Sequence, residues 1–101
     1  MNTTDTTTQA ATQLTRRAVW TVTAAATRPQ PAVHVTPRQV AGSGGAAVSI
    51  GDDRHPVIFV EYANGWTVCV DGLPDADTLS ARDAEKALVS GLEYCLAHNA
   101  H

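Results

Sequence analysis

The chain is poor in cysteine, lysine and aromatic residues, with two, one and five of these among its 101 residues. Cys69 and Cys95 form no Cys-x-x-Cys pair, and the sequence has no closely spaced quartet of cysteines and histidines. This pattern argues against a disulfide framework and a zinc ribbon, because each needs several suitably spaced cysteines or histidines. We therefore expect two free thiols, no bound metal and no cofactor.

Long hydrophobic runs are also absent, which argues against a membrane-spanning helix of about 20 apolar residues. Residues 1–8 have neither a basic start nor an apolar segment, so they do not resemble a secretory signal. Apolar residues make up 44% and charged residues 17% of the chain, which is typical of a globular protein. We predict a cytoplasmic protein whose residues 14–101 fold as a single domain.

No catalytic motif is present. Residues 42–45, Gly-Ser-Gly-Gly, lack the lysine that follows in a phosphate-binding loop. Cys69 with His34 or His55 is a conceivable nucleophile pair, but Cys69 lies between valines in a strand pattern, where thiols are usually buried and inert. The sequence therefore predicts a protein that is not an enzyme.

Charge is divided unevenly along the chain, whose net charge is −3. Residues 1–40 carry a balance of +3 and residues 41–101 a balance of −6. Because an acidic surface repels phosphate backbones, nucleic-acid binding is open only to the basic N-terminal part. The residues available for it are Arg16, Arg17, Arg28 and Arg38, with Trp20 or Trp66 for base stacking.

The clearest structural pattern is a β-hairpin over residues 57–71 followed by a helix over residues 81–97. Asn64-Gly65 separates two β-branched and aromatic runs, and this dipeptide favours a tight turn. Ser80 is a suitable N-cap, and Gly91 within the helix predicts a close approach to the sheet. The helix carries an apolar stripe of Ala84, Leu88, Leu92 and Cys95.

The expected hairpin register has consequences for both faces of the sheet. A two-residue loop places Ala63 opposite Trp66 and Phe59 opposite Val70. Both faces are then largely apolar, whereas a sheet with one wet face alternates apolar and polar residues. We therefore expect both faces to be covered, one by the C-terminal helix and the other by the N-terminal half, a second copy or another partner.

The N-terminal half carries weaker signals. Residues 1–13 are rich in threonine and predict a disordered tail. Residues 14–27 fit either a helix or a strand, and the β-branched residues favour a strand over residues 18–24. Further strands are predicted over residues 32–36 and 46–50, with loops over residues 42–45 and 72–79.

The expected fold class is α+β: a small antiparallel sheet of three to five strands packed against the C-terminal helix.

One family resemblance is carried by Asn64-Gly65-Trp66, Leu73-Pro74 and Ala84-Glu85-Lys86-Ala87-Leu88. This order resembles HicB-type antitoxins, which have a strand, a glycine-aromatic pair, a strand, Leu-Pro and an Ala/Glu-rich helix. The chain departs from that family where a Pro-Gly-Cys is expected, because only three residues separate Pro74 from Thr78. The resemblance implies an antitoxin-type regulator as an alternative function.

These observations predict a small, non-enzymatic regulatory protein that binds a protein partner, either another protein or a second copy of itself. The predicted partner-binding residues combine an aromatic pair beside the turn with an acidic loop: Tyr62, Trp66, Asp71, Asp75 and Asp77. The alternatives are a nucleic-acid-binding module that uses the four N-terminal arginines and the HicB-like regulator.

Overall fold

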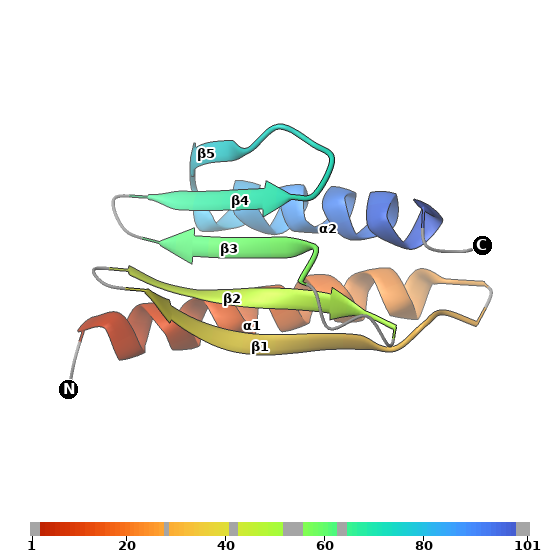
Figure 1. Cartoon of the computed structure of the whole chain (residues 1–101), viewed down its shortest axis with the longest axis horizontal. Coiled ribbons are helices and arrows are strands. Elements are labelled where there is room, and N and C mark those ends of the chain that lie inside the picture. Colours follow the sequence, from red (N-terminus) through yellow and green to blue (C-terminus); the bar gives the residue numbers. More distant parts are fainter. Residues whose placement is uncertain (1–2, 28, 41–42, 52–55, 63–64, 99–101) are drawn as a thin grey trace.

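The fold is known from a computed structural model that describes residues 3–27, 29–40, 43–51, 56–62 and 65–98. It confirms the predicted α+β class, with five strands and two helices (Figure 1). In chain order the elements are α1 (Thr3–Ala25), β1 (Val33–Val40), β2 (Ser43–Ile50), β3 (Ile58–Tyr62), β4 (Trp66–Val70), β5 (Ala76–Leu79) and α2 (Ala81–His98).

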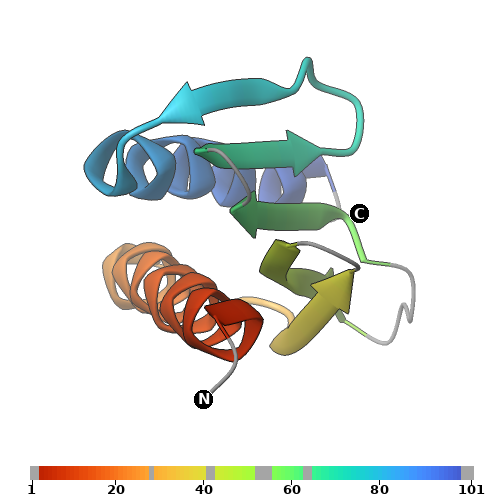
Figure 2. The same cartoon turned by 90° about the vertical axis from the view of Figure 1, so that its left-hand side faces the viewer.

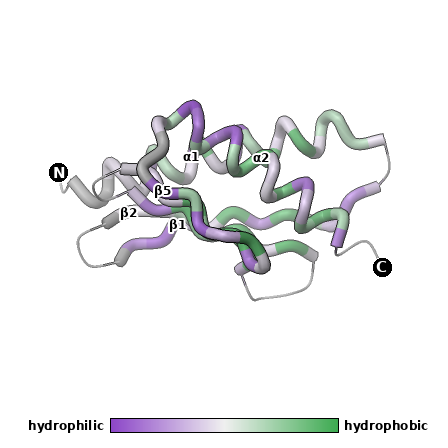
Figure 3. Tube along the Cα trace, turned by 90° about the horizontal axis from the view of Figure 1, so that it is seen from above, coloured by the Kyte–Doolittle hydropathy of each residue, from purple (hydrophilic) through white to green (hydrophobic). Residues whose placement is uncertain are grey.

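The sheet is an antiparallel meander whose spatial order is β1-β2-β3-β4-β5. Both helices pack on the same face of this sheet, and they lie beside each other (Figures 2 and 3). Helix α1 contacts β1, β2 and β3, whereas α2 contacts β4 and β5. The other face, which we call the open face, is covered by no described element.

The hydrophobic core lies between the sheet and the two helices. The core side chains from α1, from the sheet and from α2 are all small or aliphatic, which allows close packing. Helix α1 contributes Ala11, Leu14 and Ala18, the sheet contributes Ala46, Val48, Ile50, Ile58, Val60, Val68 and Val70, and α2 contributes Ala84, Leu88, Leu92, Cys95 and Leu96.

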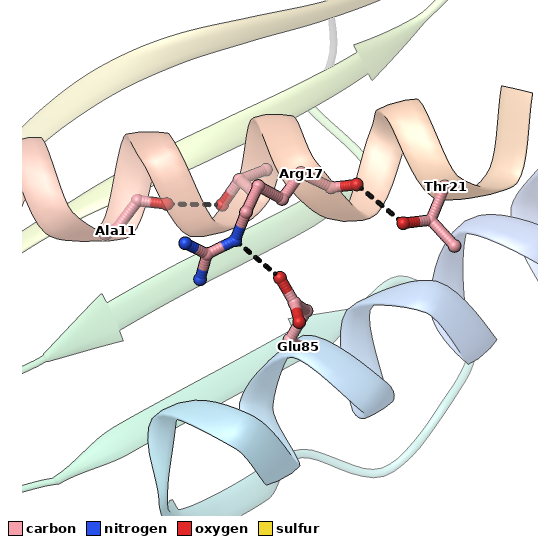
Figure 4. Close-up of polar contacts among 5 residues, drawn as sticks. Ala11, Arg17, Thr21 and Glu85 are labelled. Carbon is pink, nitrogen blue, oxygen red and sulfur yellow. Dashed lines mark hydrogen bonds and ion pairs between the residues drawn. The ribbon is translucent and has the colours of Figure 1, made fainter. Parts of the chain in front are cut away.

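The predicted tail over residues 1–13 and the predicted strand over residues 18–24 are both wrong for the described residues, because Thr3–Ala25 is one helix. Threonine is a weak helix former, yet here several threonine hydroxyls bond to backbone carbonyls one turn back. The Thr12 hydroxyl donates to the Thr8 carbonyl at 2.7 Å. The Thr15 hydroxyl donates to the Ala11 carbonyl at 2.7 Å, and the Thr21 hydroxyl donates to the Arg17 carbonyl at 2.9 Å (Figure 4). Packing of α1 against the sheet therefore outweighs the low helix propensity of its threonines.

The loop predicted over residues 42–45 is also wrong where it is described, because β2 begins at Ser43. A Cβ at Gly44 would overlap the Thr7 and Thr8 hydroxyls and would lie 2.5 Å from the backbone nitrogen of Thr8. The glycine therefore lets α1 approach β2 closely.

Strand β1 extends the predicted strand over residues 32–36 and passes through Pro37. Strand β5, Ala76–Leu79, occupies part of the loop predicted over residues 72–79. A strand of four residues is too short to show a clear alternating pattern in the sequence. Its strand conformation depends on its antiparallel pairing with β4.

The hairpin is confirmed, but its predicted register is wrong by one residue. Tyr62 pairs with Trp66, so that three residues separate the strand ends and Val60 lies opposite Val68. In this register Ile58, Val60, Val68 and Val70 all point toward the helices and are buried. Burial of these four side chains decides the register, since a shift of one residue would place the apolar pair of one strand on the opposite face from the apolar pair of the other.

The predicted C-terminal helix is confirmed as Ala81–His98. The Ser80 hydroxyl accepts a hydrogen bond from the Asp83 backbone N–H at 3.2 Å, which is the predicted N-cap. A Cβ at Gly91 would lie 2.7 Å from the Val70 Cγ2 atom, which confirms the close approach of α2 to the sheet.

We expect Gly91→Ala to lower the free energy of unfolding by about 1–2 kcal/mol, although alanine has the higher helix propensity. The Val70 side chain is β-branched and stiff, so relieving the overlap requires α2 to move away from the sheet. Chemical denaturation measures the change. Ser90→Ala, on the exposed side of the same turn, is the matched control, and a Gly91→Ala protein as stable as this control would contradict the close approach.

Candidate functional site

The structure separates the predicted partner-binding residues into two groups on opposite sides of the sheet. Tyr62 and Trp66 lie on the helix side, with ring centroids 5.1 Å apart, beside the start of α1. Asp71, Asp75 and Asp77 lie at the β4–β5 end, where Asp71 and Asp75 border a hollow on the open face. These five residues do not form a single surface.

The Cys69 thiol lies near three carboxylates, those of Asp75, Glu61 and Asp77. Burial, the charge of Asp75 and a hydrogen bond to its carboxylate raise the pKa of Cys69 to about 11, and Glu61 and Asp77 add to the effect. A thiol with this pKa is almost fully protonated at neutral pH, and the thiolate is the nucleophilic form. This environment is the opposite of the one that activates a catalytic cysteine.

We expect Cys69 to be alkylated much more slowly at pH 8 than a cysteine in a free peptide, with the rate rising up to about pH 11. Asp75→Asn should lower this pKa and speed the reaction at pH 8 several-fold, because one negative charge and one acceptor are removed. Mass spectrometry of the Cys69 peptide after iodoacetamide treatment gives the rate. Glu93→Gln, on the exposed part of α2, is the control, and equal rates in both variants would contradict the role of Asp75.

The predicted arginines are dispersed as well. Arg17 on α1 forms an ion pair with Glu85 on α2, with Nε and Oε1 2.8 Å apart (Figure 4). Arg38 reaches across the open face, where its guanidinium lies 4.3 Å from the centroid of the Phe59 ring. Arg16 lies on α1, and Arg28 falls outside the described residues. The three described arginines therefore make no common basic surface.

The open face is more polar than the predicted register implied. It presents one half-buried aromatic ring, Phe59, among short or polar side chains. Its members on the central strands and β1 are His34, Thr36, Arg38, Ala47, Ser49, Phe59, Glu61, Thr67 and Cys69. Such a face is typical of an antiparallel sheet exposed to water, so the expectation that both faces must be covered loses its basis.

Trp20 is the most exposed large hydrophobic residue among those described, with 72% of its surface accessible. It lies on α1 beside a hollow that also reaches the first residues of β1, and this hollow is lined by Arg16, Val19, Trp20, Thr23, Val33 and Val35. Had residues 14–27 been interpreted as a helix, the sequence would have predicted an exposed Trp20. At about 100° per residue, Trp20 lies about 200° around the helix from Ala18, which belongs to the buried stripe.

The free edge of β1 runs beside this hollow. The Gly51 N–H donates to the Ala32 carbonyl at 2.7 Å, and Ala32 precedes β1 in register with β2. Backbone groups alternate in direction along a strand, so those of Val33 and Val35 point away from β2, to the sheet edge. Pro37 has the same parity, and its missing N–H therefore costs no bond to β2.

An edge strand is a template for another strand unless proline or charge protects it. Pro37 and Arg38 protect the second half of β1, whereas Val33 and Val35 leave the first half unprotected. We call the surface made by Arg16, Trp20, Val33 and Val35 the Trp20 surface.

No helix in the described part of the chain is long and apolar enough to cross a membrane. The described residues also contain no group of three or more side chains that could hold a metal ion. No protein-family model, characterised protein or solved structure is detectably similar to the chain.

Proposed function

We propose that the protein is a non-enzymatic, cytoplasmic interaction protein that binds another protein chain through the Trp20 surface. The observation that supports this proposal is the exposure of Trp20 beside an unprotected strand edge. Tryptophan is among the residues most enriched at the energetic centres of protein interfaces. An indole left in water is a cost that burial against a partner removes.

The strand edge sets the kind of partner segment that fits. Strand addition supplies main-chain hydrogen bonds, and pockets for alternate side chains supply specificity. An extended segment placed beside Val33 and Val35 would turn alternate side chains toward the hollow next to Trp20. The partner is therefore a protein that offers a short extended segment with an apolar side chain.

Binding of single-stranded nucleic acid is the second candidate function. It is favoured by one observation: Arg16 and Trp20 line the same hollow, so that a phosphate contact and a stacking ring are adjacent. Against it stand the net charge of −3 and the positions of Arg17 and Arg38, which contact Glu85 and Phe59. The HicB-like regulator remains a prediction from sequence alone.

Tryptophan fluorescence can separate these functions, because the chain has only two tryptophans. In Trp66→Phe, Trp20 is the sole reporter, and burial by a protein should shift its emission to shorter wavelength. A single-stranded oligonucleotide at low salt should instead quench it by stacking, with affinity that falls steeply as salt is added.

Protein partners are sought with a photo-crosslinking amino acid at position 16, in the cells from which the sequence comes. The same amino acid at position 90, exposed on α2, is the control. Protein adducts at position 16 that disappear when Trp20→Asp is added would support the proposal. Equal adduct patterns at both positions, or none at position 16, would refute it.

A further inference from the structure

We infer that the segment bound at the Trp20 surface is β1 of a second copy, paired antiparallel about a twofold axis that passes beside His34. This inference rests on the proposed function and names its partner. The two sheets would join edge to edge into one sheet of ten strands, with all four helices on one side.

The prolines restrict the register of such a pair. If Val33 of one copy faces Val35 of the other, all backbone N–H and C=O groups of these residues can be satisfied, by four hydrogen bonds. This symmetric register keeps Pro31 and Pro37 outside the paired stretch. Sliding one strand by two residues, the next register in which edge-facing groups meet, places Pro31 or Pro37 opposite a valine. The carbonyl of that valine then lacks a donor, because proline has no N–H.

The position of Trp20 agrees with this register independently. The hollow beside Trp20 is lined by Val33 and Val35, the same residues whose backbone groups face the free edge and would pair. A twofold axis beside His34 therefore brings both Trp20 side chains to the same region on the helix side of the joined sheet. Each indole that is now 72% exposed would gain a neighbouring protein surface.

The other candidate occupant is an extended segment of a different protein. A second copy fits better because the edge is self-complementary. In β1 itself, Val33 and Val35 are two uncharged, apolar residues at alternate positions, which is the spacing that pairing requires. Its exposed His34 and Thr36 side chains point to the open face and do not obstruct pairing.

Sedimentation of the purified chain over a dilution series tests self-association. We expect a monomer–dimer equilibrium whose association constant falls about thirtyfold in Trp20→Ala, as for an interface residue worth about 2 kcal/mol. Val35→Pro should abolish dimers, because it removes an edge-facing N–H. Gln39→Pro is its matched control, since residue 39 has the same parity but lies outside the paired stretch. Circular dichroism establishes that each variant is folded.

Cysteine crosslinking tests the register. Two copies of His34 face each other across the axis at about 4.5 Å between Cα atoms, which suits a disulfide. In a Cys69→Ser background, His34→Cys should therefore form covalent dimers on mild oxidation. Thr36→Cys should not, because its two copies are separated by about four residues of strand, roughly 13 Å. Crosslinking through position 36 in place of position 34 would overturn the register.

The outcomes distinguish this inference from the function on which it rests. A chain that stays monomeric at every concentration, with position 16 crosslinked to a protein of different mass, would overturn the second copy and leave the proposed function standing. A monomer without specific crosslinks at position 16 would overturn both. Dimers that are unchanged by Trp20→Ala and Val35→Pro would show that self-association uses another surface, which also overturns the inference.

Discussion

Leu92→Asp is expected to unfold the protein. Leu92 is 1% exposed and lies in the middle of α2, within the core formed with the sheet. The substitution removes a buried leucine side chain, which costs about 2–5 kcal/mol, and buries a carboxylate without a partner, which costs several more. The sum is comparable to the whole stability of a domain of this size, about 5–15 kcal/mol.

Thermal melts followed by circular dichroism would measure this effect. Ser90→Asp is the matched control, because it introduces the same charge on the exposed side of α2. Tyr62→Ala should also remain folded, since the Tyr62 side chain is at the sheet end and 37% exposed. A cooperative Leu92→Asp melt near the wild-type midpoint would mean that α2 does not cover the sheet with this face.

Gly44→Val is expected to give the second largest loss of stability, about 3 kcal/mol. The added side chain would occupy the space of Thr7, Thr8 and the backbone between them, so a rotamer change cannot relieve the overlap. The first turns of α1 must then move away from β2. We expect amide hydrogen exchange to accelerate over these turns, beyond the change expected from global destabilisation.

The control for this prediction lies on the same strand. Ser49 is half-buried on the open face of β2, so Ser49→Val adds a β-branched residue without touching α1. This variant should retain wild-type stability within about 0.5 kcal/mol, as surface substitutions usually do. If the two variants had equal stabilities in urea denaturation, the close packing of α1 on Gly44 would be contradicted.

The register of the hairpin decides which surface of the sheet is available to a partner. With Ala63 opposite Trp66, apolar residues would lie on both faces of the sheet, and the second face would require a cover. With Tyr62 opposite Trp66, the apolar residues of β3 and β4 lie mainly under the helices. The apolar surface left exposed therefore lies at the edge of the sheet, beside Trp20, and not on its open face.

The elements with strong local signals were predictable from the amino-acid sequence. Asn64-Gly65 marks the hairpin, and Ser80 with the apolar stripe marks α2, because turn geometry and helix capping depend on a few adjacent residues. Gly91 was interpretable for the same reason, since a glycine inside a well-marked helix needs an explanation from packing.

The N-terminal helix and the exposure of Trp20 depend on packing between distant parts of the chain. Residues 3–25 form a helix because the sheet buries Ala11, Leu14 and Ala18, and this burial outweighs the low helix propensity of the threonines. The same packing selects which side of α1 faces water, and so it leaves Trp20 outside beside the edge of β1. Burial is shared among residues far apart in the chain, whereas propensity and capping act within a few residues. The Trp20 surface depends on burial and was therefore not predictable from local sequence patterns.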